Sequence, residues 1–179
     1  MKFTPLTING AWLIELEKRG DDRGFFARAY CEQEFADHQI DFHISQANLS
    51  FCVNAGTIRG MHYQRAPHGE AKLMRCIRGK IVDAFIDLRP DSSTYLQSEM
   101  VELDAENRQM VFIPAYCAHG YQSLVDNTEV MYHVSSPYTP GAEKGSRWND
   151  PQFKLKWPIT DNLTLSDKDQ NWPDFVTEI

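Results

Sequence analysis

Apolar and polar side chains alternate along much of this chain, and an alternation with a period of two is typical of β-strands. In KIVDAFIDL, residues 80–88, one face carries Val82, Ala84, Ile86 and Leu88, while Asp83 and Asp87 interrupt the other. Similar runs, separated by turn-rich segments, lie at residues 95–103, 108–115, 120–125 and 128–135. The spacing of these short strands predicts an all-β fold, an antiparallel sandwich or barrel.

Helical periodicity is scarce, and the best candidate is the short segment of residues 31–40, in which Phe35 is the main apolar anchor. Between Ser136 and Asn162, four prolines and two glycines exclude long regular elements, which predicts an ordered tail that wraps around the sheets. No internal repeat or interdomain linker interrupts the chain. We therefore expect a single domain over residues 1–179.

The composition is that of a folded globular protein, with 42% hydrophobic and 12% aromatic residues. No stretch approaches the roughly 20 apolar residues of a membrane-spanning helix, so no membrane partner is expected. The apolar run near the N-terminus is broken by Asn9 and Gly10, and then by Glu15 and Glu17, so it lacks the core of a secretory signal. We expect a cytoplasmic protein. A formal net charge of -7 and a pI near 5.3 argue against a nucleic-acid binder.

Positive charge is nevertheless concentrated in one part of the chain. Residues 59–80 hold a single acid, Glu70, and six basic side chains, which are Arg59, Arg65, Lys72, Arg75, Arg78 and Lys80. Because the chain as a whole is acidic, this cluster predicts a local positive field for a small anion. The acidic balance of the whole chain does not act against such a local site.

Two histidines are candidates for chemistry at the ends of predicted strands. His62 follows Arg59 and Gly60 at the start of one strand, and His119 stands just after an apolar strand. Each could simply be hydrogen-bonded within the fold. The two could also bind a metal ion, as small double-stranded barrels often do through an H-x-H pair. Here Gln64 takes the place of the second histidine, and an amide oxygen is a poor substitute for imidazole, so no metal is expected.

A lysine, a tyrosine and a carboxylate complete the candidate chemistry. Lys72 would be a solvated charge on most strands, but within the basic cluster its ammonium could stabilise an oxyanion near His62. Tyr132 shares a strand face with two valines, so it is either a core residue or, if that face lines a cavity, a phenol that points inward. Asp167 and Asp169 form a solvated turn, or one of them orients His62.

In succession, these segments resemble the nucleotide-sugar 3,5-epimerases of the dTDP-4-dehydrorhamnose epimerase family. The resemblance spans nearly the whole chain, from DDRGFF at residues 21–26 through ISQANLS, GTIRGMHYQ, AKLMRC, DLRPDSSTY, IPAYCAHGYQ, EVMYHVSSPYTP, RWNDP and WPI to LSDKD. It implies a cupin-type double-stranded β-helix, or jelly roll, with short peripheral helices and an irregular C-terminal tail. It also implies a homodimer that exchanges N-terminal strands, for which the apolar segment AWLIEL, residues 11–16, is a candidate.

The resemblance further implies roles for individual residues. The family's base matches His62, and the carboxylate partner of that base matches Asp169. The tyrosine on the opposite face of the sugar matches Tyr132, and the lysine beside the sugar oxygen matches Lys72. Its substrate contacts match Arg23, Gln46, Asn48, Arg59, His119, Glu143 and Lys168, and the aromatic residue that stacks on the nucleobase matches Tyr138. Several positions depart from the family, with Arg28 in place of a nucleotide-binding glutamate, Glu70 in place of glutamine, and Tyr116 and Cys117 in place of Gly and Phe.

The chemistry that the resemblance implies is consistent with these residue types. A carbon-bound hydrogen beside a ketone is a weak acid, so a base such as His62 and a cation such as Lys72 must meet at the same carbonyl group. Inversion requires the proton to return from the other face, for which Tyr132 is the candidate. Because the 4-keto group of the substrate already activates the neighbouring carbons, neither a redox cofactor nor a metal is expected.

The most specific expectation is the conversion of dTDP-4-dehydro-6-deoxy-D-glucose to dTDP-4-dehydro-L-rhamnose. The residues leave open which nucleotide carries the sugar, dTDP, CDP, GDP or UDP, and whether C3 and C5 are both inverted. Two other classes of function remain alternatives. One is a metal-dependent cupin oxygenase that uses His62 and His119, and the other is a noncatalytic protein that only binds a sugar nucleotide.

Overall fold

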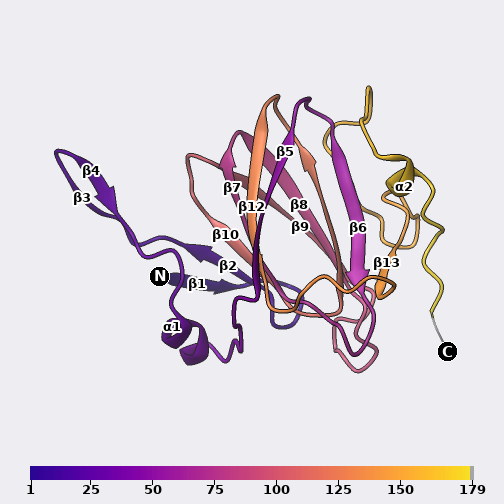
Figure 1. Cartoon of the computed structure of the whole chain (residues 1–179), viewed down its shortest axis with the longest axis horizontal. Helices are drawn as coiled ribbons and strands as arrows, with labels where there is room; N and C mark the ends of the chain where they lie inside the picture. The colour runs from indigo at the N-terminus through magenta and orange to yellow at the C-terminus, as the bar shows by residue number, and fades with distance from the viewer. Residues whose placement is uncertain (178–179) are drawn as a thin grey trace.

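Two antiparallel β-sheets face each other in the computed structural model, which describes residues 1–177 (Figure 1). The first sheet consists, in spatial order, of β1 (Lys2–Pro5), β2 (Trp12–Glu15), β10 (Met110–Ile113), β7 (Lys72–Arg78), β12 (Thr128–Val134) and β5 (Gln46–Cys52). The second sheet consists of β13 (Glu143–Gly145), β6 (Ile58–Gln64), β11 (Cys117–Ser123), β8 (Lys80–Asp87) and β9 (Ser98–Asp104). This architecture confirms the predicted antiparallel sandwich.

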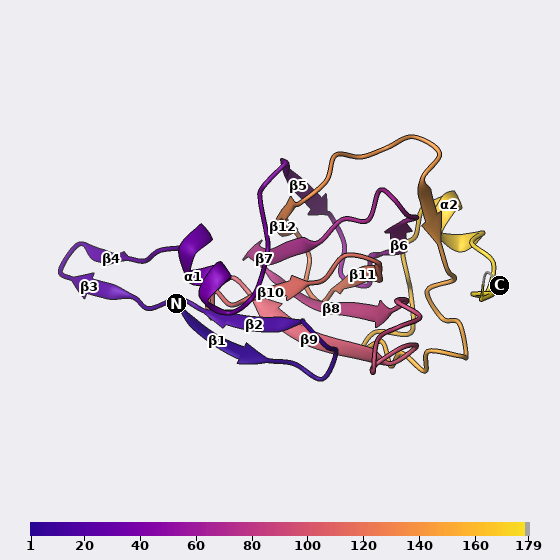
Figure 2. The same ribbon diagram turned by 90° about the horizontal axis from the view of Figure 1, so that it is seen from below.

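Smaller elements lie outside the two sheets. Strands β3 (Arg19–Asp21) and β4 (Gly24–Phe26) form a hairpin that projects away from the body of the molecule (Figures 1 and 2). Helix α1 (Glu32–Asp37) confirms the short helix expected within residues 31–40, and α2 (Asp167–Gln170) is a single turn beside β6. Within residues 1–177, no helix is long and apolar enough to cross a membrane.

Helix α1 is held on the outer side of the first sheet by a cluster of aromatic rings. Phe35 is fully buried, and its ring centroid lies 5.9 Å from that of Phe42 and 6.1 Å from that of Phe112 on β10. Each such aromatic pair contributes roughly 0.5–1.5 kcal/mol beyond the area that it buries. A helix of six residues is too short to be stable alone, so this packing, rather than helix propensity, keeps α1 in place.

Strand β8 has two buried faces, which its alternating pattern did not predict. Its apolar face, with Ala84 and Ile86, packs under Phe153 and Trp157 of the C-terminal tail. The other face, with Phe85, points into the interior between the sheets. Asp83 and Asp87 share that second face and are 0% exposed, so both carboxylates are enclosed in the protein. The tail therefore wraps over the second sheet, as expected.

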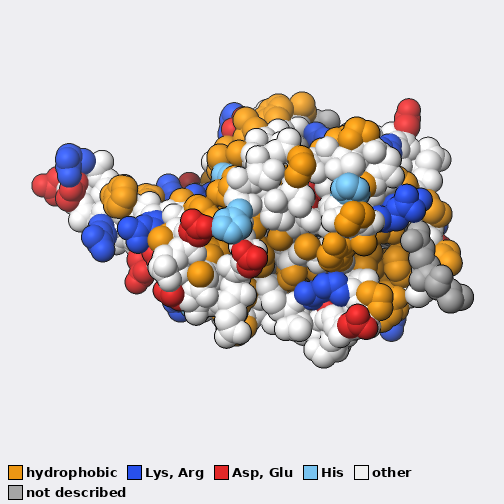
Figure 3. Space-filling model, turned by 60° about the horizontal axis from the view of Figure 1, so that its bottom comes forward, with side chains coloured by type: hydrophobic (Ala, Val, Ile, Leu, Met, Phe, Trp, Pro, Cys, Tyr) orange, Lys and Arg blue, Asp and Glu red, His pale blue; other side chains and the backbone are white. Residues whose placement is uncertain are grey.

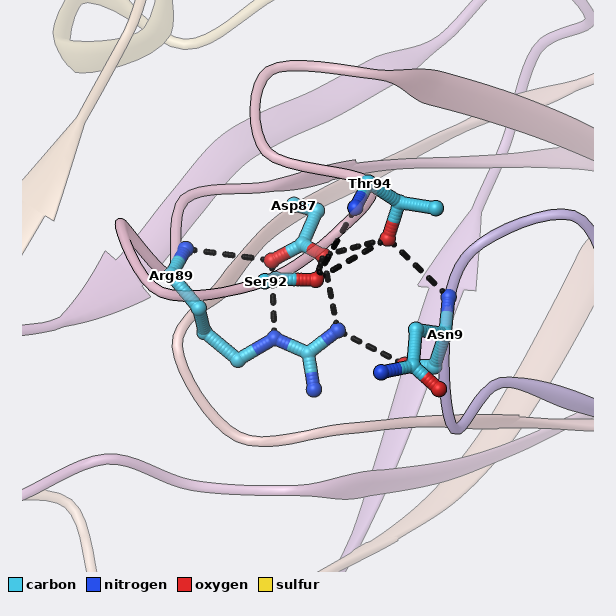
Figure 4. Close-up of polar contacts among 5 residues, drawn as sticks. All are labelled: Asn9, Asp87, Arg89, Ser92 and Thr94. Carbon is cyan, nitrogen blue, oxygen red and sulfur yellow. Dashed lines mark hydrogen bonds and ion pairs between the residues drawn. The ribbon is translucent and has the colours of Figure 1, made fainter.

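Asp87 is the centre of a polar cluster that joins two distant parts of the chain (Figure 4). Arg89 donates to it from Nε and Nη2, each at 2.7 Å, and the hydroxyl groups of Ser92 and Thr94 donate at 2.6 and 2.7 Å. Arg89 also donates to the carbonyl oxygen of Asn9 at 2.7 Å, and the Asn9 amide donates to Thr94 Oγ1 at 3.1 Å. The cluster thus fixes the turn between β1 and β2 against the connection from β8 to β9.

Replacement of Asp87 by asparagine is expected to reduce stability in a pH-dependent way. Burial alone would raise the pKa of Asp87, but the hydrogen bonds from Arg89, Ser92 and Thr94 outweigh it and lower this pKa from 3.8 to about 2. The ionised carboxylate therefore adds about 2 kcal/mol above pH 4, and this contribution disappears as the pH falls towards 2. Urea unfolding of Asp87→Asn at pH 7 should show a loss of about that size or more, and the loss should shrink in acid.

The control for this variant is Asp91→Asn, which removes an exposed carboxylate from the same connection. We expect its free energy of unfolding to stay within about 0.5 kcal/mol of wild type at every pH. Equal stabilities for wild type and Asp87→Asn at pH 7 would contradict the role given to the cluster.

Candidate active site

A cavity of about 450 Å³ lies between the two sheets, and both sheets contribute to its walls. The first sheet contributes side chains from the inner faces of β5, β12 and β7, and the second sheet contributes side chains from β6, β11 and β13. Apart from Arg23 and Arg28, every predicted site residue lines this cavity: His62, Tyr132, Asp169, Lys72, Gln46, Asn48, Arg59, His119, Tyr138, Glu143 and Lys168.

An irregularity in β6 brings two of these residues to the same side of the strand. Arg59 and His62 are three positions apart, so plain alternation would place them on opposite faces. At Gly60 the backbone φ is 119°, and the register of β6 against β11 shifts at this point. A Cβ atom on Gly60 would lie 2.6 Å from both Gly120 Cα and the carbonyl oxygen of His119, so only glycine permits this approach.

Replacement of Gly60 by alanine is therefore expected to disrupt the cavity. Gly141 provides a matched control, because its φ is also positive, at 85°, but a Cβ there meets nothing within 4 Å. Gly141→Ala should lose about 1 kcal/mol of unfolding free energy through backbone strain alone. Gly60→Ala should lose about 3 kcal/mol or more, because steric overlap with β11 is added to the strain. Equal losses in chemical denaturation would contradict this account of β6.

His62 is paired with a buried carboxylate from α2. Its Nε2 lies 2.5 Å from Asp169 Oδ1, and Asp169 is 4% exposed. The backbone amide of Asp169 donates to the side chain of Ser166, which caps this helical turn. Burial alone would raise the pKa of Asp169, but the hydrogen bond to His62 and the charge of that ring outweigh it and hold the pKa below its ordinary value. Of the two readings of LSDKDQ, the structure therefore supports the one in which Asp169 orients His62.

Tyr132 lines the same cavity as His62, but from the opposite sheet. It lies on the inner face of β12 with Val134, and this placement supports the reading in which the face borders a cavity. Burial raises the pKa of Tyr132, and the negative charge of Glu70 raises it further, while Arg59 acts against both. The phenol is therefore protonated at neutral pH and able to donate a proton.

Lys72 lies on β7, beside β12, with its ammonium in the cavity wall. It forms an ion pair with the carboxylate of Glu70, and the two side chains are 8% and 16% exposed. The cavity wall thus contains an acid–base pair on the side of His62 and a cation–carboxylate pair on the side of Tyr132.

A second group of candidate residues lies together around Tyr138 and helix α2. Glu143 Oε2 accepts a hydrogen bond from Lys168 Nζ at 2.5 Å and one from the Tyr138 hydroxyl at 3.2 Å. The backbone amide of Tyr138 donates to Gln46 Oε1 at 2.9 Å. Tyr138 itself is 58% exposed, so its ring is accessible for stacking against a planar ligand. Asn48, which pairs with Tyr132 in the strand register, completes this side.

His119 does not stand at a strand end, and neither does His62. Both lie inside their strands and are direct cross-strand partners in the register of β11 and β6. His119 Nε2 is 3.1 Å from Oδ2 of Asp83, whose pKa is raised by burial in spite of the nearby charges of His119 and Lys72. The two imidazoles are thus bonded to different carboxylates. Residues 1–177 contain no group of three or more His, Cys, Asp or Glu side chains arranged to hold a metal ion.

The prediction of one continuous basic cluster was wrong. Of its six members, only Arg59 and Lys72 line the cavity, because the strands alternate their faces and belong to different sheets. Arg75 points to the other face of β7 and contacts Met110, and Lys80 pairs with Glu102 at 2.6 Å. In the described part of the cavity wall, Lys72 and Lys168 each have an acidic partner, whereas Arg59 donates to the carbonyl oxygen of Phe51 at 3.0 Å. Arg59 is therefore the cation best placed to receive an anion.

Arg23 and Arg28 lie on and beside the projecting hairpin, away from the cavity of their own chain. Arg23 is paired with Asp21 at 2.6 Å and its side chain is 90% exposed, and Arg28 is paired with Glu34 at 2.9 Å. Within a single chain, the expectation that these residues join the site is not met, because the hairpin extends outward from the first sheet (Figure 2).

Sequence reasoning missed two residues close to the catalytic candidates. Asp83 was read as an interruption of a strand face, although it supports His119 from beneath the cavity. Trp172 packs its ring against Gly145, where a Cβ would lie 2.3 Å from the indole, and its ring centroid is 6.4 Å from that of His62. The available signal for Asp83 was a carboxylate within an otherwise apolar strand, whereas nothing in the sequence connects Trp172 to β13.

The fold and the cavity together define a class of protein: a jelly-roll enzyme equipped for acid–base chemistry on a ligand held between its sheets. Comparison with known proteins gives the family. The sequence model of the dTDP-4-dehydrorhamnose 3,5-epimerase family matches residues 5–177. The enzyme of that name from Methanothermobacter thermautotrophicus is 39% identical over 174 residues, which are 96% of this chain and 92% of the relative. The chain therefore belongs to the dTDP-4-dehydrorhamnose 3,5-epimerase family.

Two further likenesses are informative. The crystal structure of dTDP-4-dehydrorhamnose 3,5-epimerase from Bacillus anthracis, with TDP and PPi bound, is similar with a TM-score of 0.93 at 37% identity, covering 97% of this chain and 99% of that chain. The dTDP-4-dehydrorhamnose 3-epimerase of Streptomyces niveus is 37% identical over 172 residues, which are 96% of this chain and 82% of the relative. These likenesses confirm the expected cupin-type jelly roll and the sugar-epimerase class.

Proposed function

We propose that this protein epimerises the sugar of a nucleotide-linked 4-keto-6-deoxyhexose, and that it converts dTDP-4-dehydro-6-deoxy-D-glucose to dTDP-4-dehydro-L-rhamnose. The observation that carries this proposal is the pair of proton-transfer groups, His62 with Asp169 and Tyr132, in the walls of one cavity but on opposite sheets. Such an arrangement is what inversion of a carbon centre requires, because one group must remove a proton and the other must return one from the opposite face.

The first step is removal of the proton from a carbon beside the 4-keto group. The imidazole of His62 accepts this proton, and the ionised Asp169 stabilises the imidazolium that results. The electron pair moves onto the ketone oxygen, where the ammonium of Lys72 stabilises the developing enolate. Each of these contributions is of the size that positioned acids, bases and charges reach in enzymes, about 10²- to 10⁴-fold in rate.

The second step returns a proton to the same carbon from the other face. Tyr132 donates it, because the phenol is protonated at neutral pH and faces the cavity from the first sheet. The sugar thus lies between β6 and β12. Arg59 supplies a positive charge for the diphosphate, and Tyr138 an exposed ring for the base. TDP bound to the Bacillus anthracis relative supports a thymidine nucleotide.

Hydrogen exchange tests the proposed function directly. In deuterated water, the protein and dTDP-4-dehydro-6-deoxy-D-glucose should give a product that carries deuterium at C3 and C5 by NMR. Deuterium at C3 alone would assign the single-centre reaction, which the 3-epimerase from Streptomyces niveus favours as the second candidate. Absence of deuterium from every 4-keto sugar nucleotide tried would exclude an epimerase and favour a protein that only binds such ligands.

Variants of the two proton-transfer groups should separate chemistry from binding. His62→Ala and Tyr132→Phe are expected to lower kcat by about 10³-fold or more while the affinity for dTDP, measured by calorimetry, changes less than about threefold. His68→Ala and Tyr95→Phe are matched controls, because neither residue lines the cavity, and both should retain wild-type turnover. Loss of dTDP binding together with turnover would indicate that the two residues bind rather than react.

We further propose a homodimer in which the hairpin of β3 and β4 reaches the cavity of the partner. The hairpin ends in charged side chains and projects into solvent (Figure 3), with Phe26 at its base 71% exposed. The outer face of the first sheet also exposes apolar side chains that an interface would cover, namely Leu49, Phe51, Ile77 and Met131. Residues 12–14 pair with β10 of their own chain, so we assign the exchange to the hairpin rather than to AWLIEL.

Complementation between inactive variants tests this exchange. If Arg23 serves the partner's cavity, a mixed dimer of Arg23→Ala and His62→Ala chains contains one intact site. After subunit exchange, a 1:1 mixture should recover roughly a quarter of wild-type activity, because half of the dimers are mixed. Mixing His62→Ala with Tyr132→Phe should recover none, because both residues belong to the same cavity. The proposed exchange would be contradicted if the mixture of Arg23→Ala and His62→Ala chains also recovered no activity, or if light scattering showed a monomer.

A further inference from the structure

Glu70 is an acid inside a cavity that is proposed to bind an anionic substrate. Its side chain is only 16% exposed, and both of its carboxylate oxygens have partners. Oε1 forms the ion pair with Lys72 of the first sheet, and Oε2 accepts from Gln64 Nε2 of the second sheet at 3.4 Å. The carboxylate therefore connects the two walls of the cavity at the point where Lys72 enters it.

Gln64 is itself held by the backbone of the segment after β12. Its Nε2 also donates to the carbonyl oxygen of Pro137 at 3.2 Å, and its Oε1 accepts from the amide of Thr139 at 2.8 Å. Glu70 is thus fixed by a residue that cannot move without breaking contacts to the backbone. An anchored carboxylate of this kind limits the positions that the flexible side chain of Lys72 can adopt.

The charge of Glu70 also reaches Tyr132. The other charged or titratable groups in the wall of this cavity come from every surrounding element, and they are Arg59, His62, Tyr63, Lys72, His119, Tyr121, Tyr138, Glu143, Lys168 and Asp169. Among these surroundings, burial and the charge of Glu70 raise the pKa of Tyr132, and Arg59 opposes them. Asp169 and Glu143 are engaged by His62 and Lys168 on other elements.

We propose that Glu70 is a positioning residue of the catalytic cavity, which anchors the Lys72 ammonium beside the reacting carbonyl group and holds a negative charge in the wall that also contains Tyr132. This inference rests on the proposed function, because it assigns Lys72 and Tyr132 their roles in the epimerisation. It explains why an acid is present where the substrate is anionic: the carboxylate acts on two catalytic candidates rather than on the ligand.

The substitution Glu70→Gln tests the proposal with little change of shape. Loss of the negative charge should lower the pKa of Tyr132, so the alkaline limb of the kcat profile should move to lower pH. At neutral pH, kcat should fall about tenfold and KM should change less than about twofold, since the loss concerns the transition state.

A measurement without substrate separates failure of this proposal from failure of the proposed function. The ultraviolet difference between wild type and Tyr132→Phe gives the titration of the Tyr132 phenol alone. The corresponding difference between Glu70→Gln and the double variant Glu70→Gln/Tyr132→Phe should be displaced to lower pH. Glu129→Gln is the control, because Glu129 lies on the same strand but not in the cavity wall, and it should displace neither curve.

The shorter acid in Glu70→Asp distinguishes the two effects of Glu70 and provides a second variant if Glu70→Gln does not fold. It keeps the negative charge but withdraws it from Lys72, so the phenol titration should stay near that of wild type while kcat falls. Wild-type kcat in Glu70→Asp would overturn the anchoring of Lys72. If the Tyr132 phenol titrates in Glu70→Gln at the same pH as in wild type, the effect of Glu70 on Tyr132 is overturned. Glu70→Ala takes the place of Glu70→Gln in this measurement if Glu70→Gln does not fold.

Discussion

The close approach of β6 and β11 at Gly60 and Gly120 is the constraint on which the site depends. A side chain at either glycine would overlap the backbone of the neighbouring strand, with Cβ contacts of 2.6 and 2.7 Å. Because the two strands touch here, β6 departs from plain alternation, and Arg59 and His62 both face the interior. The anion-binding candidate and the candidate base are thus brought to one wall by backbone packing, before any polar contact forms.

Charge in the cavity is organised in pairs rather than as a single positive field. Lys72 with Glu70, Lys168 with Glu143, and His62 with Asp169 each combine a cationic or basic group with a carboxylate. Pairing lowers the penalty of holding charges away from water, which would be several kcal/mol for an isolated ion. It also leaves Arg59, which donates to the carbonyl oxygen of Phe51, as the cation of the cavity wall without a carboxylate partner among the described residues. The net charge of -7 on the whole chain has little influence inside such a site.

The sequence predicted the sandwich, helix α1 and the wrapping tail, because these follow from local periodicity and composition. It did not predict features that depend on pairing between distant strands. His62 and His119 were placed at strand ends, whereas both lie inside paired strands, and the neighbouring glycines Gly60 and Gly120 permit close strand contact. The six basic residues formed a cluster along the chain but not in space, because neighbours in a strand face opposite sides. The position of Arg23 and Arg28 cannot be derived from one chain if the hairpin serves another.

The presence of two histidine–carboxylate pairs raises the question of which imidazole removes the proton, and their surroundings differ in a way that favours one of them. The side chain of His62 is 31% exposed and that of His119 is 9% exposed, so a sugar can reach His62 more fully. Asp169 has a lowered pKa and remains ionised, which suits a partner that must stabilise an imidazolium. Asp83 is completely enclosed and its pKa is raised, so it supports the charged state of its histidine less effectively. When two similar histidine–carboxylate pairs have such different surroundings, one pair can serve catalysis and the other can serve binding. They favour His62 as the base and His119 as a donor to a substrate oxygen.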